Sequence, residues 1–133
     1  MLGKQIADLK GKVMGQRVID AEGPTMETTL SQNGDVNGIQ VNETVSYVGR
    51  LTSPGVIHAV GNGVLMAAET EIATFTAEGV GRVSPSGSLV WRGSHFYRTS
   101  STGKLAFLDN VIGMFEAGIS ADGNSAKIVW EWK

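Results

Sequence analysis

The chain has 133 residues, of which 41% are hydrophobic and 18% charged, and its 11 basic and 13 acidic side chains nearly balance. This length and composition are typical of one self-folding domain spanning residues 1–133, and they exclude an intrinsically disordered chain. The basic residues form no stripe that could follow a nucleic acid backbone, and the absence of cysteine excludes disulfides, thiolate metal sites and cysteine nucleophiles.

Membrane and secretory signals are missing as well. No apolar run approaches the roughly 20 residues of a membrane helix, and residues 1–10 lack the apolar core of a secretory signal. We therefore expect a cytoplasmic protein with no membrane or nucleic acid partner. His58 and His95 are the only histidines and form no H-x-H cluster, so no metal site and no cofactor is expected. The dinucleotide-binding, P-loop and nucleophile-elbow motifs are absent too.

Residues 1–11 form a lead-in to the first strand. Leu2, Ile6 and Leu9 recur at helical spacing and the segment stops at Gly11. This pattern predicts either a short N-terminal helix or a frayed start to the first strand.

From Lys12 onward, β-branched and aromatic runs separated by glycines predict about eight short antiparallel strands joined by tight turns. Turn signals lie at residues 22–24, 33–38, 53–55, 84–87, 100–103 and 122–124. Asn-Gly and Asp-Gly pairs among them favour the positive φ angles of hairpin turns. A further reversal or bend is expected at residues 67–69. Two Gly-x-Gly pairs, at 61–63 and 79–81, predict bulges rather than phosphate loops.

Residues 39–47 show the clearest strand alternation. Ile39, Val41, Val45 and Tyr47 point one way, and polar side chains point the other. Glu43 falls inside the apolar stripe, so we expect its carboxylate in the barrel interior. One hypothesis pairs it with an inward arginine such as Arg92, or with Tyr or Trp donors. The other makes it a ligand-anchoring or acid–base group with a pKa raised by burial.

Residues 56–66 carry apolar or small side chains on both faces. His58 and Asn62 share one face with valines and Met66, so His58 is either a core histidine or a second pocket group. Two covered faces are typical of a barrel whose outside packs on another subunit, or of a strand whose glycines mark tight curvature. We therefore expect a homo-oligomer, a dimer or a trimer.

Two later segments complete the strand pattern. Residues 89–99 place Trp91, His95 and Tyr97 on one side and Arg92, Phe96 and Arg98 on the other, and either set can line a pocket. Asn110 and Glu116 give a weaker indication of polar groups inside. The last strand, residues 128–132, carries Trp130 and Trp132 on one face, which must be packed and paired to avoid an exposed apolar edge. This favours a closed antiparallel barrel over an open sheet or a sandwich.

The glycine spacing resembles a known barrel superfamily. The residues concerned are 55–61 (GVIHAVG), 102–108 (TGKLAFL), Gly113, Asp122-Gly123 and Trp130. Over residues 39–132 the chain is similar to the allene oxide cyclase-like barrels, which include dirigent proteins and spirotetronate cyclases; a lipocalin-like barrel is the alternative. The resemblance implies eight strands, a dimer or trimer, and an interior cavity open at one end for an apolar molecule. Some members fold a bound substrate without a cofactor.

Three functions follow as hypotheses, and whether the protein is an enzyme stays open. The first is binding of a small, largely apolar molecule in the barrel interior. The expected lining residues are Val41, Glu43, Val45, Tyr47, His58, Asn62, Arg92, Phe96 and Trp130. The second is a cofactor-free cyclase or isomerase of a hydrophobic substrate, in which Glu43, His58 or Tyr47 moves protons. The third is an assembly protein with a solid barrel and no ligand.

Overall fold

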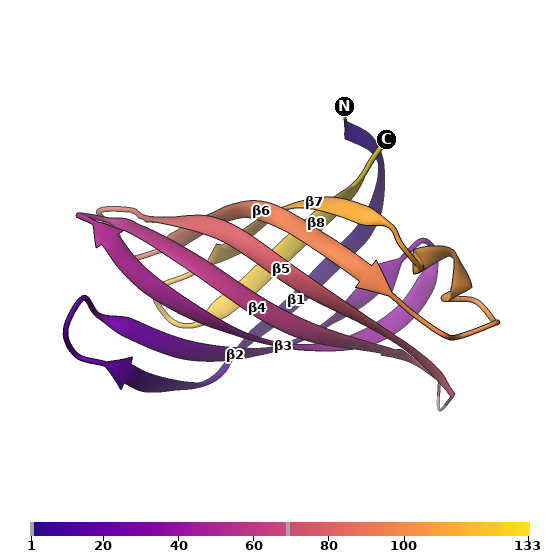
Figure 1. The fold of residues 1–133 in the computed structure, drawn as a ribbon, viewed down its shortest axis with the longest axis horizontal. Helices are drawn as coiled ribbons and strands as arrows, with labels where there is room; N and C mark the ends of the chain where they lie inside the picture. The colour runs from indigo at the N-terminus through magenta and orange to yellow at the C-terminus, as the bar shows by residue number, and fades with distance from the viewer. Residues whose placement is uncertain (1, 69) are drawn as a thin grey trace.

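The computed structural model describes residues 2–68 and 70–133 as a closed barrel of eight antiparallel strands (Figure 1). Each strand pairs with the next along the chain, and β8 pairs with β1. The elements are β1 (Leu2–Asp20), β2 (Thr25–Val36), β3 (Ile39–Ser53), β4 (Val56–Ala67), β5 (Glu71–Val83), β6 (Leu89–Arg98), the 3-10 turn η1 (Ala106–Leu108), β7 (Ile112–Ile119) and β8 (Asn124–Trp132). The predicted fold class, an all-β closed antiparallel barrel, is confirmed.

The C-terminal strand closes the barrel, but with its indoles outward. β8 pairs with β1 from Leu2–Trp132 to Lys12–Asn124 and with β7 on its other side. Strand alternation turns Ser125, Lys127 and Val129 inward, so the face with the indoles points outward. Trp132 is 54% exposed and Trp130 is half-buried. The expectation that both indoles are packed is therefore wrong for Trp132.

Of the two alternatives for residues 1–11, the helix is wrong: the described part of the segment belongs to the first strand, because β1 begins at Leu2. The pairing of β1 with β8 shifts register between Leu2 and Gln5 and again between Gln5 and Ala7. These irregularities interrupt the strict alternation, so the adjacent residues Ile6 and Ala7 are both buried, together with Leu9. A bulged strand thus produces apolar spacing that imitates a helix.

The turn expected over residues 33–38 is shorter than predicted. Only Asn37 and Gly38 form it, with φ of 50° and 86°, as a two-residue hairpin turn requires. Gly34 lies inside β2 opposite Leu9, and a Cβ there would come within 2.2 Å of the Asp8 carbonyl oxygen. That glycine permits close approach of two strands. β4 ends at Ala67 and β5 begins at Glu71, so the chain reverses as expected near residues 67–69, although Glu69 lies outside the described residues.

The two ends of the barrel differ. The four turns β1–β2, β3–β4, β5–β6 and β7–β8 meet at one end, which we name the open end. The long β6–β7 connection with η1 lies at the other, capped end (Figure 1). There Leu105 and Leu108 are fully buried. The Glu71 carboxylate anchors this connection by accepting hydrogen bonds from Lys104 N (2.8 Å), Leu105 N (3.1 Å) and the Ser101 hydroxyl.

β1 is longer than its partner β8. Pairing between them ends at Lys12 and Asn124, and the next link is a single hydrogen bond from Val13 N to the Gly123 carbonyl. Beyond that point β1 pairs only with β2, as far as Asp20 and Thr25. The β1–β2 hairpin therefore overhangs the open end with one unpaired edge.

Aromatic rings inside the barrel lie opposite glycines. Phe75 faces Gly63, Trp91 faces Gly81 and Phe115 faces Gly93 across neighbouring strands. A Cβ on Gly63 would sit 2.0 Å from the Phe75 ring, so the ring occupies the space that a side chain would need. The pairing of β4 with β5 runs without a register shift, so the bulges predicted at 61–63 and 79–81 are absent. These inward glycines instead make room for rings, a known device for curving a sheet.

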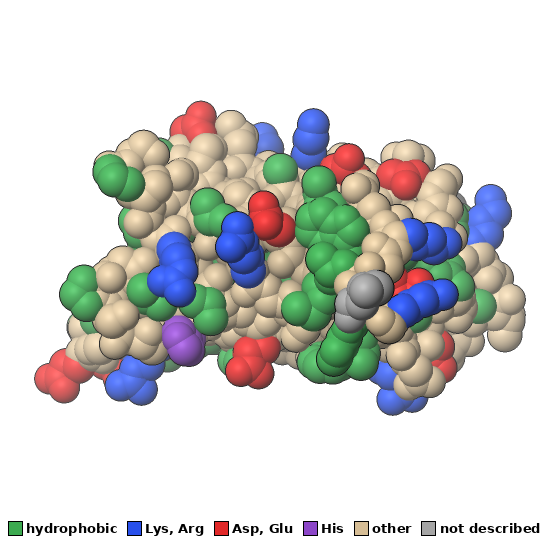
Figure 2. Space-filling view, turned by 90° about the horizontal axis from the view of Figure 1, so that it is seen from above, with side chains coloured by type: hydrophobic (Ala, Val, Ile, Leu, Met, Phe, Trp, Pro, Cys, Tyr) green, Lys and Arg blue, Asp and Glu red, His purple; other side chains and the backbone are tan. Residues whose placement is uncertain are grey.

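Apolar side chains also gather on the outside. Figure 2 shows hydrophobic side chains in a band on one face of the barrel, flanked by charged ones. The pairing places outward-facing Trp130 opposite Met114 and Phe96 opposite Ile112. Helical structure in the described parts of the chain is limited to the short η1 turn, and no helix there is long and apolar enough to cross a membrane.

Candidate functional site

The inward stripe of β3 lies where the alternation predicted it. Val41, Glu43 and Val45 are buried, and Tyr47 is half-buried. Glu43 is only 1% exposed, so a carboxylate lies deep in the interior. Such a group needs compensation, because an isolated charge in an apolar medium is very unfavourable.

Lys127 of β8 supplies that compensation from across the barrel. Its Nζ lies 2.7 Å from Glu43 Oε2, and Gln32 Nε2 donates to the same oxygen at 2.7 Å. Ser125 in turn donates to Gln32 Oε1 at 2.9 Å. We name Glu43, Lys127, Gln32, Ser125 and His95 the interior polar cluster. Its side chains come from four strands and bind one another, which fixes their relative register.

Arg92 is not the partner of Glu43, contrary to one hypothesis from the sequence. Trp91 and Gly93 face inward, so alternation turns Arg92 outward. There it forms an exposed ion pair with Glu116, Nε to Oε2, at 3.3 Å. The indication that Glu116 points inside is wrong for the same reason, since Phe115 and Ala117 take the inward positions of β7.

His95 connects the polar cluster to the aromatic interior. Its ring lies between Phe75 and Phe115, with centroids 4.2 Å and 4.5 Å away, and its Nε2 is 3.0 Å from Lys127 Nζ. Burial, with the nearby Lys127 charge, holds the pKa of His95 well below its usual range. His95 is therefore neutral. Because an ammonium only donates, Nε2 accepts and the ring proton is assigned to Nδ1.

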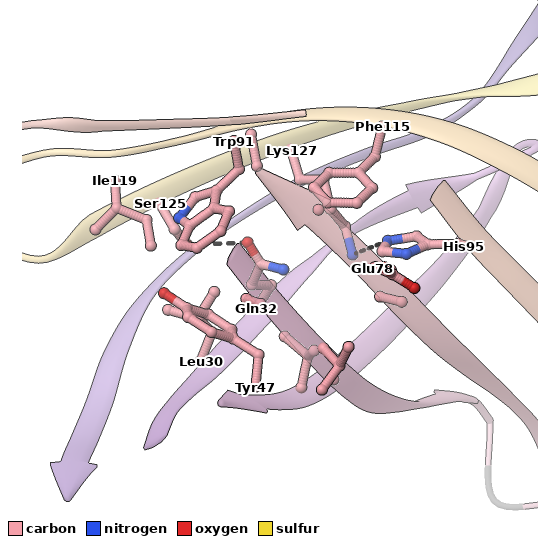
Figure 3. Close-up of a pocket in the computed structure, with 17 residues that line it drawn as sticks. Leu30, Gln32, Tyr47, Glu78, Trp91, His95, Phe115, Ile119, Ser125 and Lys127 are labelled. Carbon is pink, nitrogen blue, oxygen red and sulfur yellow. Dashed lines mark hydrogen bonds between the residues drawn. The ribbon is translucent and has the colours of Figure 1, made fainter. Parts of the chain in front are cut away.

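Two hollows lie between the cluster and the open end, and the first of them adjoins the cluster. The inner cavity has a volume of about 60 Å³ and a mostly apolar wall that includes Val45, Ala59, Ala77 and Ala117, with Lys127 and His95 at its polar side (Figure 3). The mouth cavity at the open end has about 250 Å³. Its walls come from the β1–β2 hairpin and from β3, β4 and β6; they include Gln16, Met26, Thr28, Leu51, Ile57 and Leu89.

Tyr47 and Trp91 line both hollows. Their rings meet edge to face, with centroids 5.2 Å apart and planes at 64°. In Figure 3 the Tyr47 hydroxyl and the Trp91 indole nitrogen point to the same side, away from Lys127 and His95. The two cavities are thus separated by the side chains of this aromatic pair.

The polar atoms of the aromatic pair are incompletely satisfied. Trp91 Nε1 is buried and makes no hydrogen bond within the described residues. Burial raises the pKa of Tyr47, and the nearby Thr28 and Trp91 side chains offset part of the increase. Trp91 Nε1 is therefore near the Tyr47 hydroxyl, but its geometry is not that of a hydrogen bond. The Tyr47 hydroxyl stays protonated at neutral pH and can donate.

Five of the expected lining residues lie outside the barrel. His58, Asn62, Arg92 and Phe96 are exposed, and Trp130 is half-buried on the outer face. The inward face of β4 instead carries the small residues Ala59, Gly61 and Gly63: the Phe75 ring fills the space beside Gly63, and the other two border the inner cavity. His58, Arg92 and Phe96 do come together, in a shallow, open depression of about 660 Å³ on the outer surface.

Sequence reasoning missed Lys127, Gln32 and Ser125. The available signal was their position in alternating strands, since Ser125, Lys127 and Val129 form one face of β8. The opposite face of β8 carries two indoles, and their apolar area led to the prediction that this face points inward. Gln32 of β2 carried no comparable signal, because its surroundings alternate weakly.

The three candidate catalytic residues are not brought together. His58 is outside, Glu43 is held in the ion pair and does not line the inner cavity, and Tyr47 alone reaches both hollows. The described residues contain no group of three or more His, Asp or Glu side chains arranged to hold a metal ion.

Comparison with known proteins finds similarity at the level of solved structures. No protein-family model matches the chain, and no curated protein is similar at a significant level. Among solved structures, the chain is similar to a conserved protein of unknown function from Rhodopseudomonas palustris, with a TM-score of 0.76 and 10% identity over 99% of both chains. This match shows the shared barrel fold.

Proposed function

We propose that this protein binds a small, largely apolar molecule that enters through the open end of the barrel. The observation that carries the proposal is that Tyr47 and Trp91 line both hollows, so a change of their rotamers would join the two spaces. Together the mouth cavity and the inner cavity reach the lower end of the roughly 300–1000 Å³ typical of ligand pockets.

The character of the walls supports an apolar ligand. Aliphatic and aromatic side chains dominate both hollows, and the one ammonium group there, that of Lys127, is already paired with Glu43. An apolar molecule in this space would displace water from apolar surface, which is favourable at about 25 cal/mol per Å². The solid-barrel hypothesis would require these hollows to stay empty.

A cavity-filling variant tests the proposal. Ala117 lines the inner cavity, whereas Ala126 is exposed on the outside of β8. Ala117→Leu should weaken binding of the apolar fluorophore 1-N-phenylnaphthylamine by about tenfold, and Ala126→Leu, which adds the same atoms outside, should leave it unchanged. Fluorescence titration measures both. If the wild type takes up no fluorophore and Ala117→Leu only raises the melting temperature, the barrel is solid and the proposal fails.

The enzymatic alternative, a cyclase or isomerase, has less support because its candidate residues lie apart. Cytoplasmic location and a dimer or trimer remain predictions. The exposed apolar side chains of the outer surface, such as Phe96 and Val60, support self-association. Light scattering at micromolar concentration tests it, and a clean monomer would contradict it.

A further inference from the structure

Trp91 carries a hydrogen-bond donor that the fold leaves unused. Its side chain is 5% exposed, and Nε1 has no acceptor among the described residues. Buried donors without partners are rare in native proteins, because each gives up its hydrogen bond to water and gains none in return. An unpartnered indole N–H in the wall of a cavity is therefore a group that a ligand atom can satisfy.

Tyr47 supplies a second donor next to it. The two rings are in edge-to-face contact, and their polar atoms point to the same side (Figure 3). Thr28, also buried, lies beside the Tyr47 hydroxyl, and the Thr28 hydroxyl oxygen accepts a hydrogen bond from Gln16 Nε2 at 3.3 Å. The Tyr47 O–H and the Trp91 N–H are thus two neutral donors at the boundary between the cavities.

The charges near the site select the kind of acceptor. None of the described residues that line the mouth cavity is charged. In the inner cavity, the Lys127 ammonium is bound by the Glu43 carboxylate at 2.7 Å. A ligand carboxylate would therefore lose its hydration without gaining a free cation, which is costly. A neutral oxygen loses far less on burial.

We propose that Tyr47 and Trp91 form a binding subsite for the carbonyl oxygen of a neutral, otherwise apolar ligand, whose hydrocarbon part occupies the adjoining cavities. This assignment rests on the proposed function and specifies its ligand class. It makes the aromatic pair a recognition element as well as a partition between the hollows.

Three probes of matched length test the assignment: 2-nonanone, n-nonane and nonanoate. Displacement of 1-N-phenylnaphthylamine gives their relative affinities, and the indole N–H resonances in a ¹H–¹⁵N spectrum report on Trp91. Trp130→Phe and Trp132→Phe assign those resonances. We expect the ketone to bind best and to shift the Trp91 resonance downfield, and the carboxylate to bind worst.

Matched variants separate the hydrogen bonds from the apolar contacts. Trp91→Phe and Tyr47→Phe should each reduce the preference for ketone over alkane by about three- to tenfold, the effect of one lost hydrogen bond. Trp130→Phe, on the outer face, should leave the preference unchanged. Melting curves establish that each variant is folded.

The outcomes distinguish the two proposals. If ketone and alkane bind equally to the wild type, or if Trp91→Phe and Tyr47→Phe both keep the preference, the carbonyl subsite is wrong while apolar binding stands. If the carboxylate binds best, the ligand class is wrong. If the fluorophore binds but none of the probes displaces it, the carbonyl subsite is wrong while apolar binding stands. If the wild type does not bind the fluorophore, the proposed function fails and this inference fails with it.

Discussion

Buried polar groups are treated differently in the two halves of the barrel interior. Toward the capped end, Glu43 is held by Lys127 and Gln32, and Lys127 also contacts His95. Toward the open end, Trp91 Nε1 has no partner in the described chain, and the Tyr47 hydroxyl lies beside it. In the first arrangement the charges of Glu43 and Lys127 neutralise each other and fix register, although Glu43 Oε1 and His95 Nδ1 make no hydrogen bond within the described residues. In the second the polar groups are neutral and line both cavities, where the proposed ligand would meet them.

The largest loss of stability is expected from a variant that breaks the interior polar cluster. Glu43→Gln leaves the Lys127 ammonium buried without its counter-charge and should lower the free energy of unfolding by about 3–5 kcal/mol at pH 7. Urea denaturation measures it. The double change Glu43→Leu with Lys127→Met should recover most of the loss, because no unpaired charge remains.

A matched surface variant is the control for that prediction. Glu116→Gln removes the partner of exposed Arg92 and should cost only about 0.2–1 kcal/mol. If Glu43→Gln cost no more than Glu116→Gln, the buried ion pair would not be structural, and Glu43 would be better explained as a functional group.

Lowering the pH should reduce the free energy of unfolding through His95 by less than Glu43→Gln does and by more than Trp91→Phe does. The folded-state pKa of His95 lies well below that of the unfolded chain, about 6.5. Above that value the histidine is neutral in both states and stability is complete. As pH falls below it, the unfolded chain binds a proton that the folded protein cannot, so stability should fall by up to about 1.4 kcal/mol per pH unit.

Urea denaturation at pH 7, 6 and 5 measures this slope. His95→Gln should reduce the slope. His58→Gln, at an exposed position, should leave the slope at its wild-type value. An unchanged slope in His95→Gln would mean that the carboxylates alone produce the acid sensitivity.

The smallest effect is expected at the open end. Trp91→Phe removes an N–H that has no partner and keeps an aromatic ring opposite Gly81, so it should cost less than about 1.5 kcal/mol. Thermal and urea unfolding measure the change. A loss above about 3 kcal/mol would show that the indole N–H is already satisfied in solution, and the contrast between the two halves would disappear.

The closure was predicted from the indoles of the last strand, and β8 does pair with β1 although Trp132 is exposed. Local patterns were sufficient to predict most of the strands and the inward direction of Glu43, because these depend on alternation or on turn residues a few positions apart. The partner of Glu43 could not be found in this way, because Lys127 lies 84 positions further along the chain. Their meeting depends on the relative stagger of strands on opposite sides of a closed barrel.

The errors at His58 and Asn62 have a different cause. Inward positions normally carry large apolar residues, so the valines on the same face as His58 predicted that this face points inward. In this barrel the Phe75 ring of β5 fills the space beside Gly63 of β4, and Ala59 and Gly61 border the inner cavity. Size complementarity between neighbouring strands, rather than hydrophobicity, decides which face of β4 is inside.

The overhanging part of β1 gives the molecule a graded pattern of local unfolding. Because residues 14–20 pair with β2 alone, amides there that point away from β2 lack a strand partner and should exchange with solvent hydrogen far sooner than those of β8. Gln16, Pro24 and Met26 of this hairpin also form part of the mouth cavity wall. The wall beside the open end can therefore separate in a sub-global fluctuation while Leu105 and Leu108 stay buried at the other end, a motion that would let the proposed ligand enter and leave without the barrel losing its closure.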